Sequence, residues 1–150
     1  MMQIPSSLLT IESLQNPKFK EWRKLTHRRE RRKQGQYMIE GFHLVEEALL
    51  SKAGVRAIIL SDALPLDHPE LTALLQLLKQ PKKGAISLYQ LPENLFKLLS
   101  QTPTPQGILA LVALPDMESA LNELLENFTQ GQSKPLRLLL LDNVQDPGNV

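Results

Sequence analysis

The sequence contains no cysteine, and this absence excludes disulfide bonds and thiolate metal sites. Aromatic residues are few, at 5% of the 150 residues, so aromatic surfaces on which a planar ligand could stack are scarce. No apolar run is long enough to cross a membrane, and the sequence does not open with a cationic leader followed by an apolar stretch. These features predict a cytoplasmic protein without a membrane partner, built as one ordinary domain or as one domain plus part of another.

Metal-binding patterns are absent as well. Asp142, Asn143 and Asp146 offer oxygen ligands near the end of the chain. Val144 interrupts the alternation that a calcium-binding loop needs, and no glutamate follows. The histidines are widely separated and have no cysteine near them: His27, His43 and His68. The sequence therefore predicts no metal site.

Charge is distributed unevenly along the chain, although the formal net charge is only +1. Residues 1–33 contain nine lysines and arginines and three glutamates, which gives this segment a net charge of +6. Residues 34–150 contain eight basic and thirteen acidic residues, which gives a net charge of −5. A basic N-terminal segment on an acidic body indicates a polyanionic partner.

The middle of the chain alternates between strand-like and helix-like patterns. The segments with strand character are 36–40, 56–61, 85–89 and 107–114, and those with helical character are 41–54, 68–80 and 91–100. This order predicts an α/β domain with a largely parallel sheet that closes near residue 114. Ahead of it, Asn16 and Pro17 are typical of a helix start, and Gly35 ends a helix expected to reach about Lys33.

A second domain is expected to begin late in the sequence. Residues 115–128 have the pattern of another helix, and residues 129–135 form a polar connector. The leucine-rich segment 136–141 is typical of a strand buried on both faces, and a polar loop follows it. The predicted organisation is a basic helical arm (1–34), an α/β domain (35–114), a helix with linker (115–135) and the start of a further domain (136–150).

The basic segment is the first candidate site. Its apolar residues Phe19, Trp22 and Leu25 recur every three positions and would dock on a core, which leaves the cations exposed. Phosphates of a nucleic-acid backbone would neutralise such a surface, whereas a merely solvated helix is the simpler alternative. The candidate RNA-binding residues are Lys18, Lys20, Arg23, Arg28, Arg29, Arg31, Arg32 and Lys33. Core packing is the expected role of Tyr37, Phe42, Tyr89 and Phe96, so electrostatic docking is expected rather than extensive base stacking.

Three separated segments resemble one known family. "SLQNPKFKEWRKLTHRRERRKQGQYMIEGFHLVEEAL" (13–49) and "TPTPQGILALV" (102–112) are similar to the start and end of the RNA-binding domain of SpoU/TrmH-type RNA ribose methyltransferases. "LLLLDNVQDPGNV" (138–150) resembles the first motif of their knotted α/β catalytic domain. The joint occurrence of the three is far more specific than any one of them.

The resemblance implies a function and a fold. The whole protein would transfer a methyl group from S-adenosylmethionine to a ribose 2′-hydroxyl of ribosomal or transfer RNA, with Asn149 matching an asparagine at the catalytic centre. A partner arginine and the motifs that hold the cofactor would lie beyond Val150, so these 150 residues are expected to bind RNA without turning it over. The implied fold is a ribosomal-protein-like parallel or mixed sheet flanked by helices, followed by the first strand of the knotted domain. Family members pair through the catalytic domain, which implies a homodimer for the whole protein and leaves a monomer open for this chain.

Two alternatives stay open on the sequence alone. A non-catalytic RNA-binding protein of ribosomal type would account for residues 1–114 but would leave the last strand and its polar loop without a role. An α/β enzyme for a small phosphorylated ligand would leave the basic segment without a role. Salt separates this second alternative from an RNA-docking arm, because affinity for RNA falls steeply as salt rises.

Overall fold

The computed structural model describes residues 8–51, 53–78 and 86–129. Five strands and six helices occur in this part of the chain. In order they are β1 (Leu8–Thr10), α1 (Pro17–Lys24), α2 (Arg28–Gln34), β2 (Gln36–Glu40), α3 (Phe42–Leu50), β3 (Val55–Ser61), α4 (Pro69–Leu78), β4 (Ser87–Leu91), α5 (Glu93–Lys97), β5 (Ile108–Ala113) and α6 (Met117–Thr129).

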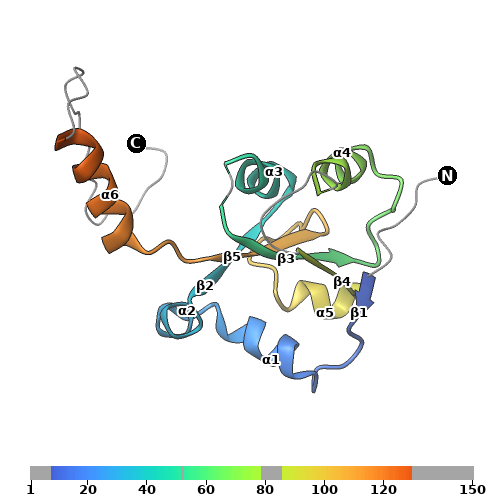
Figure 1. Ribbon diagram of the computed structural model, residues 1–150. Coiled ribbons are helices and arrows are strands. Elements are labelled where there is room, and N and C mark those ends of the chain that lie inside the picture. Colours follow the sequence, from blue (N-terminus) through green and yellow to red (C-terminus); the bar gives the residue numbers. More distant parts are fainter. Residues whose placement is uncertain (1–7, 52, 79–85, 130–150) are drawn as a thin grey trace. The chain divides into compact units, whose positions relative to one another are not determined.

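The strands form one mixed sheet in the order β1-β4-β3-β5-β2. Helices α3 and α4 cover one face of the sheet, and α1, α2 and α5 lie on the other (Figure 1). Strands β1, β4 and β3 are parallel, whereas β5 runs antiparallel to both of its neighbours, β3 and β2. The expected α/β class with a mixed sheet and flanking helices is confirmed. Strand β1 was not expected from the sequence.

The expectation of a largely parallel sheet is wrong for β5. Helix α5 has only five residues, which is a length of roughly 8 Å, whereas the six-residue β5 extends about 20 Å. So short a helix does not carry the chain back along the sheet, and the loop after it stays where β2 ends, because Ser100, Gln101 and Thr102 donate hydrogen bonds to Glu40. The chain therefore re-enters at the edge where β3 and β4 end, and β5 must run in the opposite direction.

Side chains alternate between two apolar cores along the strands. On β3, Ala57 and Ile59 face the core under α1 and α5, and Ile58 and Leu60 face the core under α3 and α4. Strand β5 alternates in the same way and is buried from Ile108 to Val112. This period of two is the pattern expected for central strands that are covered by helices on both faces.

The single helix expected from Asn16 to Lys33 is two helices. Helix α1 ends at Lys24, and His27 has extended backbone angles before α2 begins at Arg28. A continuous helix would crowd like charges along one side, and the threonine and histidine in the break are weaker helix formers than their neighbours. The break lets α1 stay on the core while α2 leads into β2.

Contacts divide the chain into two compact units between Leu114 and Pro115. The expected basic arm therefore belongs to the same unit as the sheet. In the second unit the described element is α6, which begins after Asp116. Hydrogen bonds from the Ser119 hydroxyl and backbone N–H hold the pKa of Asp116 below its usual value, as suits a charged acceptor at a helix start.

Among the described helices none is long and apolar enough to span a membrane.

Candidate nucleic-acid interface

Helix α1 is fixed to the sheet by one apolar stripe. The Asn16 side chain caps the helix by accepting from the Lys18 N–H at 2.9 Å. Phe19, Trp22 and Leu25 are buried, as their spacing predicts, and the Trp22 ring meets Tyr89 edge-on with 5.1 Å between ring centroids. The cations of α1 must therefore point away from the core.

The cations of α1 and α2 form what we name the basic helix pair. The exposed members are Lys18, Lys20, Arg23, Lys24, Arg28, Arg29, Arg32 and Lys33. Within the described ranges, no carboxylate pairs with any of them. Lys18 also approaches the face of Tyr89, with its Nζ 5.4 Å from the ring centroid. An unpaired cationic surface of this density attracts polyanions.

Arg31 differs from the other arginines of α2 because it is half-buried. One of its terminal nitrogens donates to the carbonyl oxygens of Leu25 and Thr26, each at 2.9 Å. These carbonyls belong to the break between α1 and α2. Arg31 therefore holds the two helices in their relative orientation, a role that its place in a basic run does not reveal.

This role predicts a difference between two neighbouring arginines. Arg31→Ala should lower the free energy of unfolding by about 1–3 kcal/mol, since it leaves two carbonyls without a charged donor. Arg32→Ala should change it by less than about 0.5 kcal/mol, because that side chain is exposed and lacks such contacts. Urea unfolding of both variants makes the comparison. Equal losses would contradict the structural role of Arg31.

Two of the segments that carry the resemblance, 13–49 and 102–112, meet where β2 ends. Glu40, the last residue of β2, accepts from the Ser100 and Thr102 hydroxyls at 2.6 and 2.7 Å and from the Gln101 N–H at 2.9 Å. The Gln106 side chain accepts from the Phe42 N–H at 3.0 Å and so caps α3 from a distant loop. Gly41 adopts a φ of +94°, and a Cβ there would lie 2.8 Å from the Gln106 oxygen. The loop 100–107 is thus tightly anchored.

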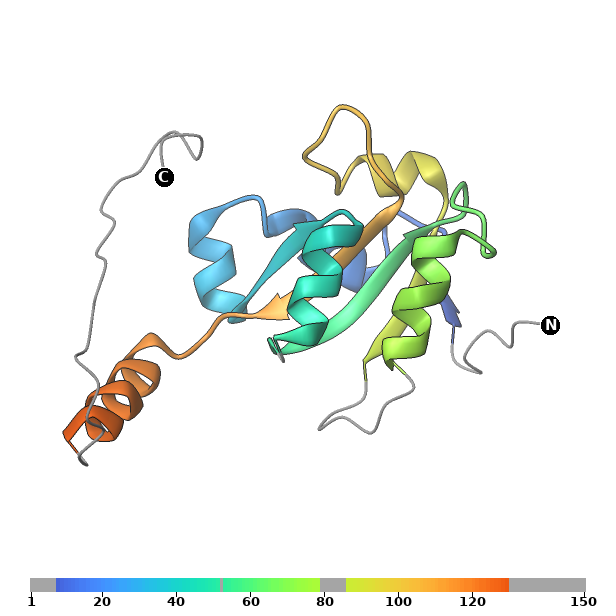
Figure 2. The same cartoon turned by 90° about the horizontal axis from the view of Figure 1, so that it is seen from above.

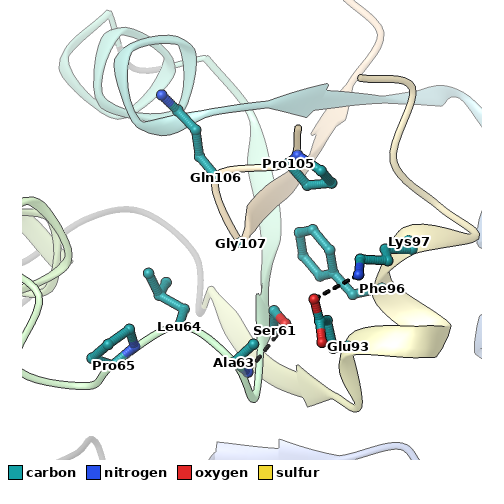
Figure 3. A pocket seen from close by; sticks show the side chains of 10 residues that line it. All are labelled: Ser61, Ala63, Leu64, Pro65, Glu93, Phe96, Lys97, Pro105, Gln106 and Gly107. Atoms are coloured by element: carbon teal, nitrogen blue, oxygen red, sulfur yellow. Dashed lines mark hydrogen bonds and ion pairs between the residues drawn. The ribbon is translucent and has the colours of Figure 1, made fainter. Parts of the chain in front are cut away.

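A pocket of about 150 Å³ lies beside this loop, where β3 ends and β5 begins. Its walls come from the segment after β3, from α5 and from residues 105–107 (Figure 3). Open α/β sheets place ligands at the carboxyl ends of parallel strands. No sequence motif marked this pocket, because its walls are far apart in the chain.

The sequence also suggested a catalytic residue and core aromatic residues, and it predicted no metal site. Asn149 and the strand expected at 136–141 lie outside the described residues. Among the described residues no group of histidines and acidic side chains could hold a metal ion. Three of the four aromatic residues expected in the core are buried: Phe42, Tyr89 and Phe96. The fourth, Tyr37, is half-buried on β2.

Residues 16–110 match the family model of the MRM3-like substrate binding domain. The chain belongs to this family. The matched region begins at the cap of α1 and ends within β5, so it contains both helices of the basic helix pair, the anchored loop and the pocket.

The chain is similar to a curated RNA methyltransferase and to solved structures of RNA methyltransferases. The chain is 35% identical over 142 residues to the 23S rRNA (guanosine(2553)-2′-O)-methyltransferase RlmP of Bacillus subtilis, covering 93% of this chain and 46% of that protein. A crystal structure of an RNA 2′-O ribose methyltransferase matches with a TM-score of 0.60 and 27% identity, over 73% of this chain and 39% of the other. The SpoU methyltransferase AviRb of Streptomyces viridochromogenes, solved with AdoMet, shares the fold with a TM-score of 0.57 and 19% identity, over 69% of this chain and 38% of the other. The chain spans about half the length of the curated relatives it matches.

Proposed function

We propose that this chain is the substrate-binding part of an RNA methyltransferase that acts on a ribose 2′-hydroxyl of ribosomal or transfer RNA. The basic helix pair docks phosphates of the RNA, and a catalytic part carries out the methyl transfer. The observation that carries the proposal is the exposed cationic surface of α1 and α2, where eight lysines and arginines outnumber Glu21 and Glu30, within a domain of the MRM3-like substrate binding family.

Methyl transfer to a ribose hydroxyl is an in-line displacement by a weak nucleophile. Its rate depends strongly on how well the hydroxyl is aligned with the methyl carbon, and its proton must be accepted. A domain that holds the RNA in one register contributes directly to that alignment. Contacts with phosphates and 2′-hydroxyls, which set position rather than sequence, suit this task.

The cofactor proposed for the whole protein is S-adenosylmethionine, which is bound in the AviRb relative. The pocket beside the loop 100–107 does not fit it, because sites for ligands of that size are typically about 300 Å³ or larger, and this pocket has about 150 Å³. We therefore assign no cofactor contact to the described residues. Three expectations from the sequence stay predictions: a catalytic role for Asn149, a homodimer for the whole protein, and a cytoplasmic location.

RNA binding across a salt series tests the proposed function. We expect this chain to bind total ribosomal and transfer RNA with a log–log salt slope that grows by about 0.7 to 0.9 for each phosphate contact. The measurement is fluorescence anisotropy between about 50 and 200 mM salt. Affinity that does not change with salt would contradict phosphate docking and favour a small phosphorylated ligand. Absence of binding at low salt would overturn the proposal.

A further inference from the structure

The pocket beside the loop 100–107 has a wall of apolar residues and a polar rim. Phe96 and Pro105 stand on one side, and Leu64 and Pro65 stand on the other (Figure 3). The Gln106 side chain points away from the pocket toward α3, so only its backbone contributes. The wall thus consists of the exposed ring of Pro65, the half-buried ring of Pro105 and the buried side chains of Leu64 and Phe96.

Backbone constraints hold the pocket in shape. Gly107 has a φ of +81°, and a Cβ at this position would lie 3.0 Å from the Leu64 Cβ. The Ser61 N–H donates to the Gly107 carbonyl at 2.9 Å, and the Asp62 side chain accepts from the Glu93 N–H at 2.8 Å. These bonds join the three segments that form the walls. The pocket is therefore a preformed feature of the sheet edge.

The volume of the pocket limits what can enter it. An apolar cavity of about 150 Å³ is known to hold one benzene ring. This pocket has the same volume, about 150 Å³, so it suits a single six-membered ring. A purine would leave one of its two rings outside.

Polar groups in the pocket suit the edge of a pyrimidine. Ser61 is only 3% exposed, and its Oγ accepts from the Ala63 N–H at 3.2 Å. Among the described residues its own hydroxyl hydrogen has no acceptor, so it is available for a base carbonyl. At the rim, Glu93 forms an ion pair with Lys97 at 2.7 Å. The carboxylate can accept from a base N–H, and the ammonium can contact a neighbouring phosphate.

The basic helix pair connects with this pocket across one face of the sheet. Helix α2 leads into β2 at Gln36, and β2 ends at Glu40 beside the loop 100–107. The length of this strand, roughly 16 Å, therefore separates the end of α2 from the loop. Helix α1 passes under the sheet between them, and α5 lies on the same face (Figures 1 and 2). An RNA strand of a few nucleotides can reach from the cations to the pocket.

We propose that the pocket receives one unpaired pyrimidine base of the bound RNA, which fixes the register of a strand whose phosphates lie on the basic helix pair. The proposal rests on the proposed RNA-binding function and adds a base contact to it. Unpaired bases are the positions at which proteins read RNA sequence. Burial of one base against apolar side chains removes its faces from water, and we expect this to raise affinity about tenfold.

The test compares oligomers of equal length that differ only in their bases: oligo(U), oligo(A) and an oligomer with abasic sites throughout. The whole 150-residue chain should bind oligo(U) about tenfold more tightly than the abasic oligomer, and more tightly than oligo(A). Ala63→Phe fills the pocket from an exposed wall position and should remove this preference, with unchanged affinity for the abasic oligomer. Ala73→Phe, at an exposed position on α4 outside the pocket, should keep it.

The outcomes separate the pocket from the phosphate docking. Equal binding of oligo(U) and the abasic oligomer, tighter binding of oligo(A), or a preference that survives in Ala63→Phe would overturn the pocket proposal and leave phosphate docking intact. Failure to bind any of the oligomers would overturn both. If Ala63→Phe folds poorly, the smaller Ala63→Leu serves as the filling variant. The wild-type comparison needs no variant and overturns the proposal by itself when the abasic oligomer binds as tightly as oligo(U).

Discussion

Replacing Arg28, Arg29, Arg32 and Lys33 together by alanine should weaken RNA binding by roughly 100- to 1,000-fold near 0.1 M salt. All four side chains are exposed, and α2 has no buried residue. If each contacts one phosphate, the log–log salt slope should fall by about 3. Alanine is the best helix former, so α2 should persist in the variant.

Arg31 is left in place in this variant because it holds the break between the two helices through the Leu25 and Thr26 carbonyls. A variant that also removed it would mix a loss of phosphate contacts with a change in helix orientation. The measurement is RNA affinity across a salt series, with helix content followed by circular dichroism.

A charge-preserving variant is the matched control. This variant carries lysine in place of Arg28, Arg29 and Arg32, so its number of positive charges is unchanged. Its salt slope should therefore stay within about one unit of the original. Affinity should fall only where a planar guanidinium makes paired bonds to one phosphate. An alanine variant with an unchanged slope would show that the RNA phosphates lie elsewhere on the domain.

The sequence predicts the elements of this fold well where burial imposes a period. Strands β2, β3 and β5 lie within a residue of their expected positions, and the stripe of α1 is buried as its spacing indicates. The spacing of buried side chains does not determine whether a strand runs parallel or antiparallel to its neighbours. The antiparallel course of β5 depends on the short length of α5 and on the hydrogen bonds that hold the following loop at Glu40, and the spacing of apolar residues around Pro92 fixes neither.

The candidate site is predictable only in part, for the same reason. Exposure of a cationic helix face follows from the burial of its opposite face, so most of the basic helix pair could be identified from sequence. The role of Arg31 depends on a helix break, and its partners become apparent only once the chain turns there. The pocket requires three segments to converge, and residues such as Ser61 and Ala63 carry no local signal of it.

Trp22→Ala should lower the free energy of unfolding by about 3–5 kcal/mol, a large share of the 5–15 kcal/mol typical of a domain. Trp22 is 5% exposed and forms part of the core under α1 and α5, where it meets Tyr89 edge-on. Its removal leaves a cavity between α1 and the sheet. Urea unfolding measures the loss.

A matched substitution on the same helix tests whether the effect comes from the buried face. Lys20→Ala should change stability by less than about 0.5 kcal/mol, since Lys20 is exposed on α1. For RNA binding, Lys20→Ala should have the larger effect of the two variants and should reduce the salt slope by up to about 0.9. The folded fraction of Trp22→Ala should keep the salt slope of the original protein. A loss of less than about 1 kcal/mol in Trp22→Ala would mean that α1 is a separate arm. The basic helix pair would then lack the rigid base that alignment of an RNA strand requires.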